Sequence, residues 1–183
     1  MKAFSRKGSV IRARMSEFER TILASLVQQV AGLLEGDAAA APSDPFAMWQ
    51  AEMGAVDLDF DDPVLARLFP AAFADDEQAS AEFRRLTAGR QRQERLSNAG
   101  RVLDDIENSD EDIVEIDAAD CDAWLKTLTS VRLALAVRLG IEVAEDTSEL
   151  DDLPEDDPRS FVYSVYEWLA YVCESLLGLG GQR

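Results

Sequence analysis

The sequence predicts a mainly α fold, one helical domain over residues 1–183 with a short N-terminal β-hairpin. Three observations lead to this prediction. Apolar residues recur at helical spacing in four long segments, capping residues precede those segments, and a period-two pattern typical of a strand occurs before residue 16. A hydrophobic content of 47% over 183 residues can form a core, and this length fits one domain.

The hairpin is expected over residues 2–15. The pair Lys7-Gly8 predicts its turn, because Gly8 adopts positive φ at little cost. After the turn, Ile11 and Ala13 alternate with arginines, as in a half-buried strand.

Five helices are expected after the hairpin. Ser16 and Glu19 have the spacing of a capping box, and Asp62 and Asp157 each precede a proline at a helix start. The expected helices are 16–35, 62–69, 76–106, 117–140 and 158–178, with loops over 37–56 and 142–157. The first loop is expected to be mobile, with a short helical turn over 46–53.

The helix over 76–106 has an interrupted apolar face. Arg90 and Gln93 stand where the 3–4 spacing calls for apolar residues. The apolar positions of this face are Ala79, Phe83, Leu86, Leu96, Leu103 and Ile106. Farther along, residues 113–116 are expected to form either a short strand or a docked extended segment.

Charge is strongly segregated along the chain, which has 36 acidic and 18 basic residues and a net charge of −18. Residues 1–14 contain five bases and no acid, and residues 84–101 contain six arginines. Residues 104–122 and 142–157 contain many carboxylates and no base. This polarity favours docking to a charged protein partner. It disfavours nonspecific binding to nucleic acid or anionic membranes, which are themselves polyanions.

The chain has no histidine, which removes histidine general bases, histidine metal ligands and histidine-activated nucleophiles. We therefore expect a protein that is not an enzyme and has no cofactor or metal. The alternating Asp57, Asp59 and Asp61 resemble part of a calcium loop, but Asp62 and Leu68 stand where an EF-hand needs Gly and Glu. We favour an acidic loop that leads into a capped helix.

The arginine-rich helix has two interpretations. Its side chains either bind an acidic partner surface or phosphates, or pair with the protein's own abundant carboxylates. Arg90 is harder to explain by internal pairing because it lies in the apolar face. The candidate partner-binding residues are Arg84, Arg85, Arg90, Arg92 and Arg95.

Two cysteines, Cys121 and Cys173, are too few for a secreted disulfide scaffold. No apolar run follows the basic N-terminus, so no signal peptide is expected. The apolar stretch 161–179 is broken by glutamates and indicates a buried helix rather than a membrane span. The expected compartment is the cytoplasm.

The role of each thiol stays open at this point. Cys121 is expected in the first turn of a helix, where the helix dipole favours a thiolate, while Asp117, Asp120 and Asp122 oppose one. Cys173 lies on a face that is expected to be buried, where a free cysteine acts as a small hydrophobic residue.

Several segments together resemble a known family. They are the basic hairpin with Ser16-Glu17-Phe18-Glu19, the start Asp62-Pro63-Val64-Leu65, the arginine-rich helix, residues 127–140 with the sequence TLTSVRLALAVRLG, and the terminal Tyr-Glu-Trp-Leu helix. The chain resembles, over essentially its whole length, an actinobacterial family of oxidation-sensing transcriptional regulators. This AosR-like family was formerly known as a domain of unknown function.

The resemblance implies a cytoplasmic regulator that senses oxidants through an intramolecular disulfide, which here can involve only Cys121 and Cys173. The oxidised form is expected to bind an extracytoplasmic-function sigma factor and to raise transcription of cysteine-biosynthesis genes. The alternatives are a redox-independent acidic adaptor or scaffold, or a direct DNA-binding regulator. No membrane partner is expected, nucleic acid is expected only as an added contact, and the oligomeric state is left open.

Overall fold

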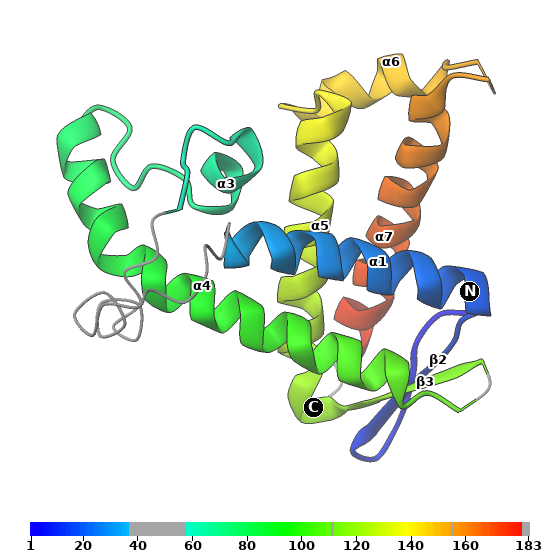
Figure 1. Cartoon of the computed structure of the whole chain (residues 1–183). Helices are drawn as coiled ribbons and strands as arrows, with labels where there is room; N and C mark the ends of the chain where they lie inside the picture. The colour runs from blue at the N-terminus through cyan, green and yellow to red at the C-terminus, as the bar shows by residue number, and fades with distance from the viewer. Residues whose placement is uncertain (37–57, 111, 155, 181–183) are drawn as a thin grey trace.

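Helices make up most of the chain, and a small antiparallel sheet lies against one end of them (Figure 1). The mainly α prediction is confirmed. The loop expected over 37–56, its helical turn over 46–53 and Asp57 lie outside the described residues. The computed structural model describes residues 1–36, 58–110, 112–154 and 156–180.

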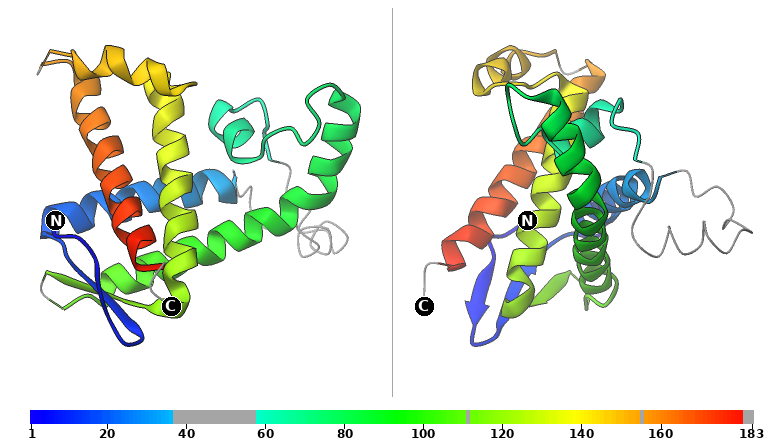
Figure 2. Two further views of the ribbon diagram at one scale, coloured as in Figure 1. Left: turned by 180° about the vertical axis from the view of Figure 1, so that it is seen from behind. Right: turned by 90° about the vertical axis from the view of Figure 1, so that its left-hand side faces the viewer.

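Four long helices carry the core. α1 (Glu17–Glu35) packs on α4 (Glu77–Glu107), while α5 (Cys121–Leu139) and α7 (Pro158–Gly180) form an antiparallel pair that crosses α1 (Figures 1 and 2). α5 is the central helix, because it packs on α1, α4, α7 and the short α3 (Pro63–Leu68). None of the helices in the described ranges is long and apolar enough to cross a membrane.

Capping residues fix two of the helix starts. The backbone N–H of Glu19 donates to Ser16 Oγ, and the backbone N–H of Ser16 donates to the Glu19 carboxylate at 2.7 Å. At α3, Asp62 Oδ1 accepts the N–H groups of Val64 and Leu65 at 2.7 and 3.0 Å. These bonds satisfy N–H groups that have no partner within the helix.

The hairpin expected over 2–15 is the first part of a three-stranded sheet. Its strands, β1 (Ser5–Lys7) and β2 (Val10–Arg14), are joined at Gly8, which has a φ of 65°. β3 (Ile113–Asp117) pairs antiparallel with β2, so the strand order is β1-β2-β3. The segment left open between a strand and an extended segment is therefore a strand.

Buried side chains hold β3 against the hairpin. Ile11 pairs directly with Ile116, and both side chains are 1% exposed. The helix expected to begin at Asp117 begins instead at Cys121, after a 3-10 turn over Ala118–Asp120. The reason is that Asp117 is paired as the last residue of β3, so its carboxylate caps the 3-10 turn rather than the helix.

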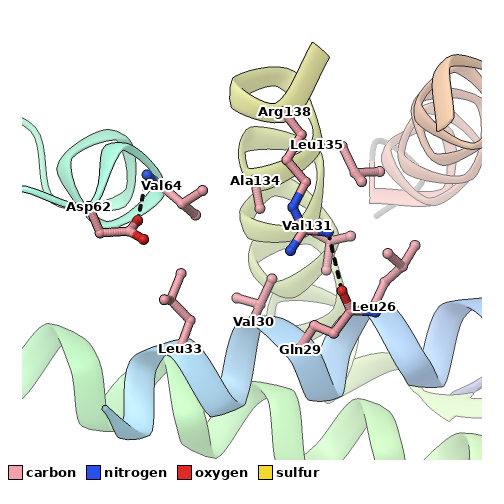
Figure 3. A pocket seen from close by; sticks show the side chains of 10 residues that line it. All are labelled: Leu26, Gln29, Val30, Leu33, Asp62, Val64, Val131, Ala134, Leu135 and Arg138. Carbon is pink, nitrogen blue, oxygen red and sulfur yellow. Dashed lines mark hydrogen bonds between the residues drawn. The ribbon is translucent and has the colours of Figure 1, made fainter. Parts of the chain in front are cut away.

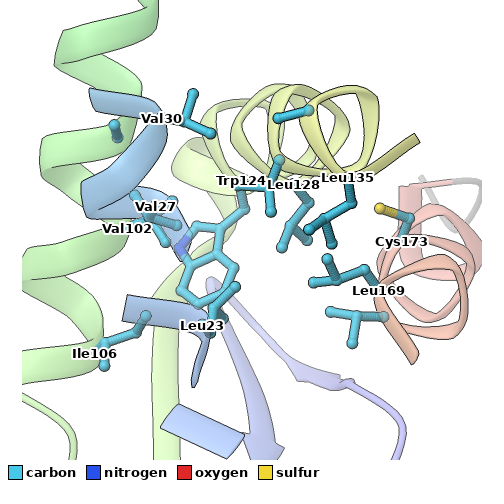
Figure 4. Close-up of a cluster of buried hydrophobic side chains, with 14 of the residues drawn as sticks. Leu23, Val27, Val30, Val102, Ile106, Trp124, Leu128, Leu135, Leu169 and Cys173 are labelled. Carbon is cyan, nitrogen blue, oxygen red and sulfur yellow. The ribbon is translucent and has the colours of Figure 1, made fainter. Parts of the chain in front are cut away.

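Among the described residues, Trp124 of α5 is the largest fully buried side chain, and it lies at the centre of the core (Figure 4). Its indole Nε1–H donates to the Asp105 carboxylate of α4 at 2.7 Å. The Phe4 ring packs edge-on against it, with ring centroids 6.1 Å apart. Other core residues come from all four long helices and include Leu23, Val27, Val102, Leu128 and Leu169.

The acidic stretch 142–157, expected to be a loop, contains α6 (Thr147–Asp151). The Asp146 carboxylate accepts the backbone N–H groups of Glu142 and Val143 at 2.8 and 2.9 Å. This capping arrangement organises a turn ahead of α6, a role that acidic composition alone does not reveal.

Tyr163 of α7 anchors α6, because its hydroxyl donates to Asp151 Oδ1 at 2.8 Å. We expect Tyr163→Phe to lower the free energy of unfolding by about 1 kcal/mol at neutral pH. Burial, with Asp151 adding to it, raises the pKa of Tyr163 to about 12. The fold thus favours the neutral phenol, and this contribution is present below the ordinary pKa of 10 and lost as the pH rises through about 12.

Urea unfolding of both proteins between neutral and strongly alkaline pH measures this effect. The stability difference between wild type and Tyr163→Phe should narrow above pH 10. A difference that stays constant would contradict the assignment.

Candidate functional site

Two of the candidate partner-binding arginines are used inside the fold. Arg92 Nε donates to the Leu34 carbonyl at the end of α1 at 2.5 Å. Arg95 donates to the Leu68 carbonyl at 2.8 Å and to Ser130 Oγ at 3.0 Å, and burial lowers the pKa of its guanidinium. These bonds tie α4 to α1, α3 and α5.

A third arginine of α4, Arg84, stacks on an aromatic ring. Its guanidinium carbon lies 4.7 Å from the centroid of the Phe60 ring, within the range of a cation–π contact. Among the residues that the structure describes, neither this arginine nor Arg92 or Arg95 has an ion pair with a carboxylate. The internal partners are helix-end carbonyls, a hydroxyl and aromatic rings, which suit a planar guanidinium.

The remaining candidates, Arg85 and Arg90, lie on the outer surface of α4 and are exposed. With them lie Phe83, 45% exposed, and Leu86, 70% exposed. We call these four exposed residues the outer face of α4. Phe83, Leu86 and Arg90 lie together on it, and Arg85 lies on its flank, about 100° around the helix from Leu86. The expectation that Phe83 and Leu86 face the core is therefore wrong. The buried side of the helix carries Ser80, Ala88, Ala99, Val102 and Ile106.

Small residues explain this reversal. Ser80, Ala88 and Ala99 are buried on this side of the helix, where the Ser80 hydroxyl bonds to the backbone of Phe73, and they share it with Arg84, which stacks on Phe60, and Arg95, which is hydrogen-bonded inside the fold. In the first half of α4 the apolar periodicity marks the opposite side, because Phe83 and Leu86 are far more hydrophobic than alanine or serine. Farther along, Leu96, Leu103 and Ile106 of the predicted apolar face do pack against the core.

Both cysteines are free thiols. Cys121 is partly exposed, and burial raises its pKa, with Arg6 opposing and Asp122 adding to the shift. Cys173 is 7% exposed, and burial raises its pKa against the influence of Arg132. Burial therefore favours the neutral thiol over the thiolate at both cysteines.

The two thiols lie on packed helices but at different levels. Phe4 links the helices, since its ring contacts Trp124 of α5 and its N–H donates to Ser175 Oγ of α7 at 2.6 Å. The contacts of Phe4 place Trp124 and Ser175 at about the same level. Cys121 comes one turn before Trp124 and Cys173 comes shortly before Ser175, and because the helices are antiparallel these steps point in opposite directions. At the rise of about 1.5 Å per residue, the two cysteine Cα atoms are therefore offset along the helix axes by about 7 Å. A disulfide needs Cα atoms about 4.4–6.8 Å apart. The Cys173 sulfur points toward α5 (Figure 4), but a bond to Cys121 requires a rearrangement.

A largely apolar groove runs along α1, which sequence reasoning missed. A hollow of about 350 Å³ lies between α1, α3 and α5, with Leu26 on its wall (Figure 3). Arg138 donates to Gln29 Oε1 at 3.2 Å at its edge. Past this bond, a second hollow of about 270 Å³ continues to α7, where Phe161 is 56% exposed. No sequence signal marks the groove, because its walls come from segments far apart in the chain.

The acidic run before α3 has local structural roles. Asp59 Oδ1 accepts the N–H of Asp61 at 3.0 Å, and Asp62 caps α3. Among the described residues, no group of three or more acidic or cysteine side chains is placed to hold a metal ion.

Comparison with known proteins adds to this geometry. The sequence model of a family described as "Domain of unknown function (DUF2017)" matches residues 1–179. The chain is 26% identical over 183 residues to a protein of Mycobacterium leprae (strain TN) named "Putative oxidative stress regulator AosR". That match covers 93% of this chain and 82% of the relative. No solved structure is a significant match.

Proposed function

The chain belongs to the DUF2017 family, and from this premise we propose that it regulates the response to oxidative stress. The AosR-like resemblance seen in the sequence is confirmed. The finer proposal is a cytoplasmic transcription regulator that is not an enzyme. It acts by contact with an alternative sigma factor and is switched by a disulfide between Cys121 and Cys173.

One observation carries the redox part of the proposal: the two cysteines of the chain lie on α5 and α7, which pack on each other more extensively than any other pair of elements. Closing the axial offset between the thiols needs a shift of one helix against the other or unwinding of the first turn of α5, where Cys121 stands. Because α1, α3 and α4 also pack on α5, such a shift reaches much of the described surface.

Cys121 is the expected first site of oxidation because it is the more exposed thiol. Its thiolate attacks peroxide, the O–O bond breaks, and a sulfenic acid and one water result. The Cys173 sulfur then displaces the sulfenic oxygen as a second water and forms the S–S bond. The two electrons lost by the sulfurs reduce the peroxide. Since the pKa of each thiol is raised, the reaction should speed up with rising pH.

The test combines intact mass with partner binding. Mild peroxide should remove two hydrogens from the wild-type chain and raise its affinity for a purified alternative sigma factor encoded in the same genome. Cys121→Ser and Cys173→Ser should each abolish the oxidant-dependent change, while Ser164→Ala at an exposed position of α7 serves as the control. An unchanged oxidant response in both cysteine variants would contradict the proposal of a disulfide switch.

The outer face of α4 supports action through protein contact. It combines two exposed arginines with two exposed apolar side chains, in a chain that is otherwise strongly acidic. A partner surface with carboxylates around an apolar centre complements it. The candidate partner-binding set thereby narrows from five arginines to Arg85 and Arg90.

A redox-independent adaptor is the second candidate. The offset between the thiols and their raised pKa values favour it, because both slow disulfide formation. Its partner binding would weaken with salt and would not respond to reductant.

Direct DNA binding has less support. In the basic hairpin, Arg12 Nε lies 2.7 Å from a Glu115 oxygen, and Arg14 Nε lies 3.6 Å from an Asp112 oxygen. These carboxylates on and beside β3 offset the positive charge that phosphates would need. A mobility shift with a steep salt dependence would be required to revive this alternative.

A further inference from the structure

A second, more polar pocket lies on the side of α5 that faces α7 and the turn before α6. It has a volume of about 460 Å³, within the usual range for small-ligand sites. Apolar residues, among them Ile141 and Val143, form part of its wall, and polar groups from four parts of the chain complete it. Its polar lining includes Arg67, Arg132, Glu142, Tyr166 and Glu167.

Arg132 is the unusual member of this pocket. Its guanidinium carbon lies 4.7 Å from the centroid of the Tyr166 ring, and its buried Nε has no hydrogen-bond partner among the described residues. Buried donors in folded proteins nearly always have a partner. In the described part of the chain the buried Nε atoms of Arg20, Arg84 and Arg95 also lack one, and Arg132 differs from them because it lines a pocket of ligand size. A planar guanidinium held by stacking is prepared for the paired oxygens of a carboxylate.

Charges of both signs line the pocket without neutralising one another. Arg67 and Arg132 are the cations, and Glu142 and Glu167 are the anions. Within the described part of the chain none of the four forms an ion pair. Arg67 instead donates to the backbone carbonyl of Glu142 at 3.2 Å. The glutamates disfavour a dianion such as a phosphate ester, whereas a ligand with one carboxylate and one ammonium group can pair with both signs.

We propose that this pocket binds a small zwitterion, with the chemistry of a free amino acid that has an apolar side chain. Arg132 binds the carboxylate, Glu167 binds the ammonium group, and Ile141 and Val143 contact the side chain. The site does not include either cysteine, and the proposal does not rest on the disulfide, although a shift of α5 against α7 would also change this pocket. It makes the protein responsive to a metabolite as well as to oxidants.

Isothermal titration calorimetry of the full chain tests the proposal with L-leucine and L-phenylalanine as probes. At least one should bind with a Kd at or below about 1 mM. N-acetyl-L-leucine lacks the ammonium charge, and L-leucinamide lacks the carboxylate. Each should bind with a Kd at least about tenfold higher than that of leucine. Absence of binding by both amino acids, or equal binding by either analogue, would overturn the proposal.

Two variants locate the site. Arg132→Gln should abolish binding, and Glu167→Gln, at an exposed position that the fold tolerates, should weaken it about tenfold. Arg138→Gln, an exposed arginine of the same helix outside this pocket, is the control and should bind as the wild type does. Wild-type affinity in Glu167→Gln would overturn the assignment even if Arg132→Gln did not fold.

Discussion

Replacing Trp124 by alanine is expected to lower the free energy of unfolding by about 3–5 kcal/mol, a large part of the stability of an ordinary domain. The side chain is 0% exposed, so its loss leaves a cavity between α1, α4 and α5. Its removal also takes away the indole N–H that donates to Asp105, a carboxyl group whose pKa is already raised by burial. Chemical denaturation followed by circular dichroism measures the change.

Two further variants separate the causes. Trp124→Phe keeps most of the buried volume and loses the bond to Asp105, so it should cost roughly 1–3 kcal/mol. Phe161→Ala removes an aromatic ring that is 56% exposed and should cost less than about 0.5 kcal/mol. A loss below about 1 kcal/mol for Trp124→Ala would contradict the central place of this side chain.

Local signals in the sequence predicted the helices well, because their causes are local. Ser16 and Asp62 do cap helices, and Gly8 does turn the hairpin. For residues 113–116 the sequence left a strand and an extended segment as alternatives. The strand partner of Ile116 is Ile11, which lies more than a hundred residues earlier in the chain. Pairing at that separation depends on the whole fold, and no short pattern specifies it.

Side-chain roles were harder to predict than elements. The helical period correctly grouped Phe83, Leu86 and Arg90 on one face of α4, but it could not tell which face meets the core. In the first half of α4 hydrophobicity pointed to the wrong side, because the buried side there relies on small residues and on arginines, whereas Leu103 and Ile106 near its end pack on the core as predicted. An arginine that bonds to carbonyls at a helix end has no sequence signature, since those acceptors belong to the backbone.

Reversing the charge of the outer face of α4 is expected to lower the affinity for the proposed sigma-factor partner about tenfold or more. The double variant Arg85→Glu and Arg90→Glu turns two attractive contacts into repulsive ones against an acidic partner. The free energy of unfolding should change by less than about 1 kcal/mol, because both side chains are exposed and Arg90→Glu replaces only an exposed attraction to Glu94 by a repulsion. Surface plasmon resonance at two salt concentrations measures the affinity.

The matched control is Lys2→Glu with Lys7→Glu, which changes the net charge equally at exposed positions of the N-terminal segment. If the outer face is the contact, this control should keep most of the affinity, and Leu86→Ala should lose affinity without any change in net charge. If the two charge reversals lower the affinity equally, the net charge of the protein governs binding, and the outer face of α4 is not a specific contact. The Leu86 variant therefore decides the matter, since an exposed leucine adds affinity only where a partner covers it.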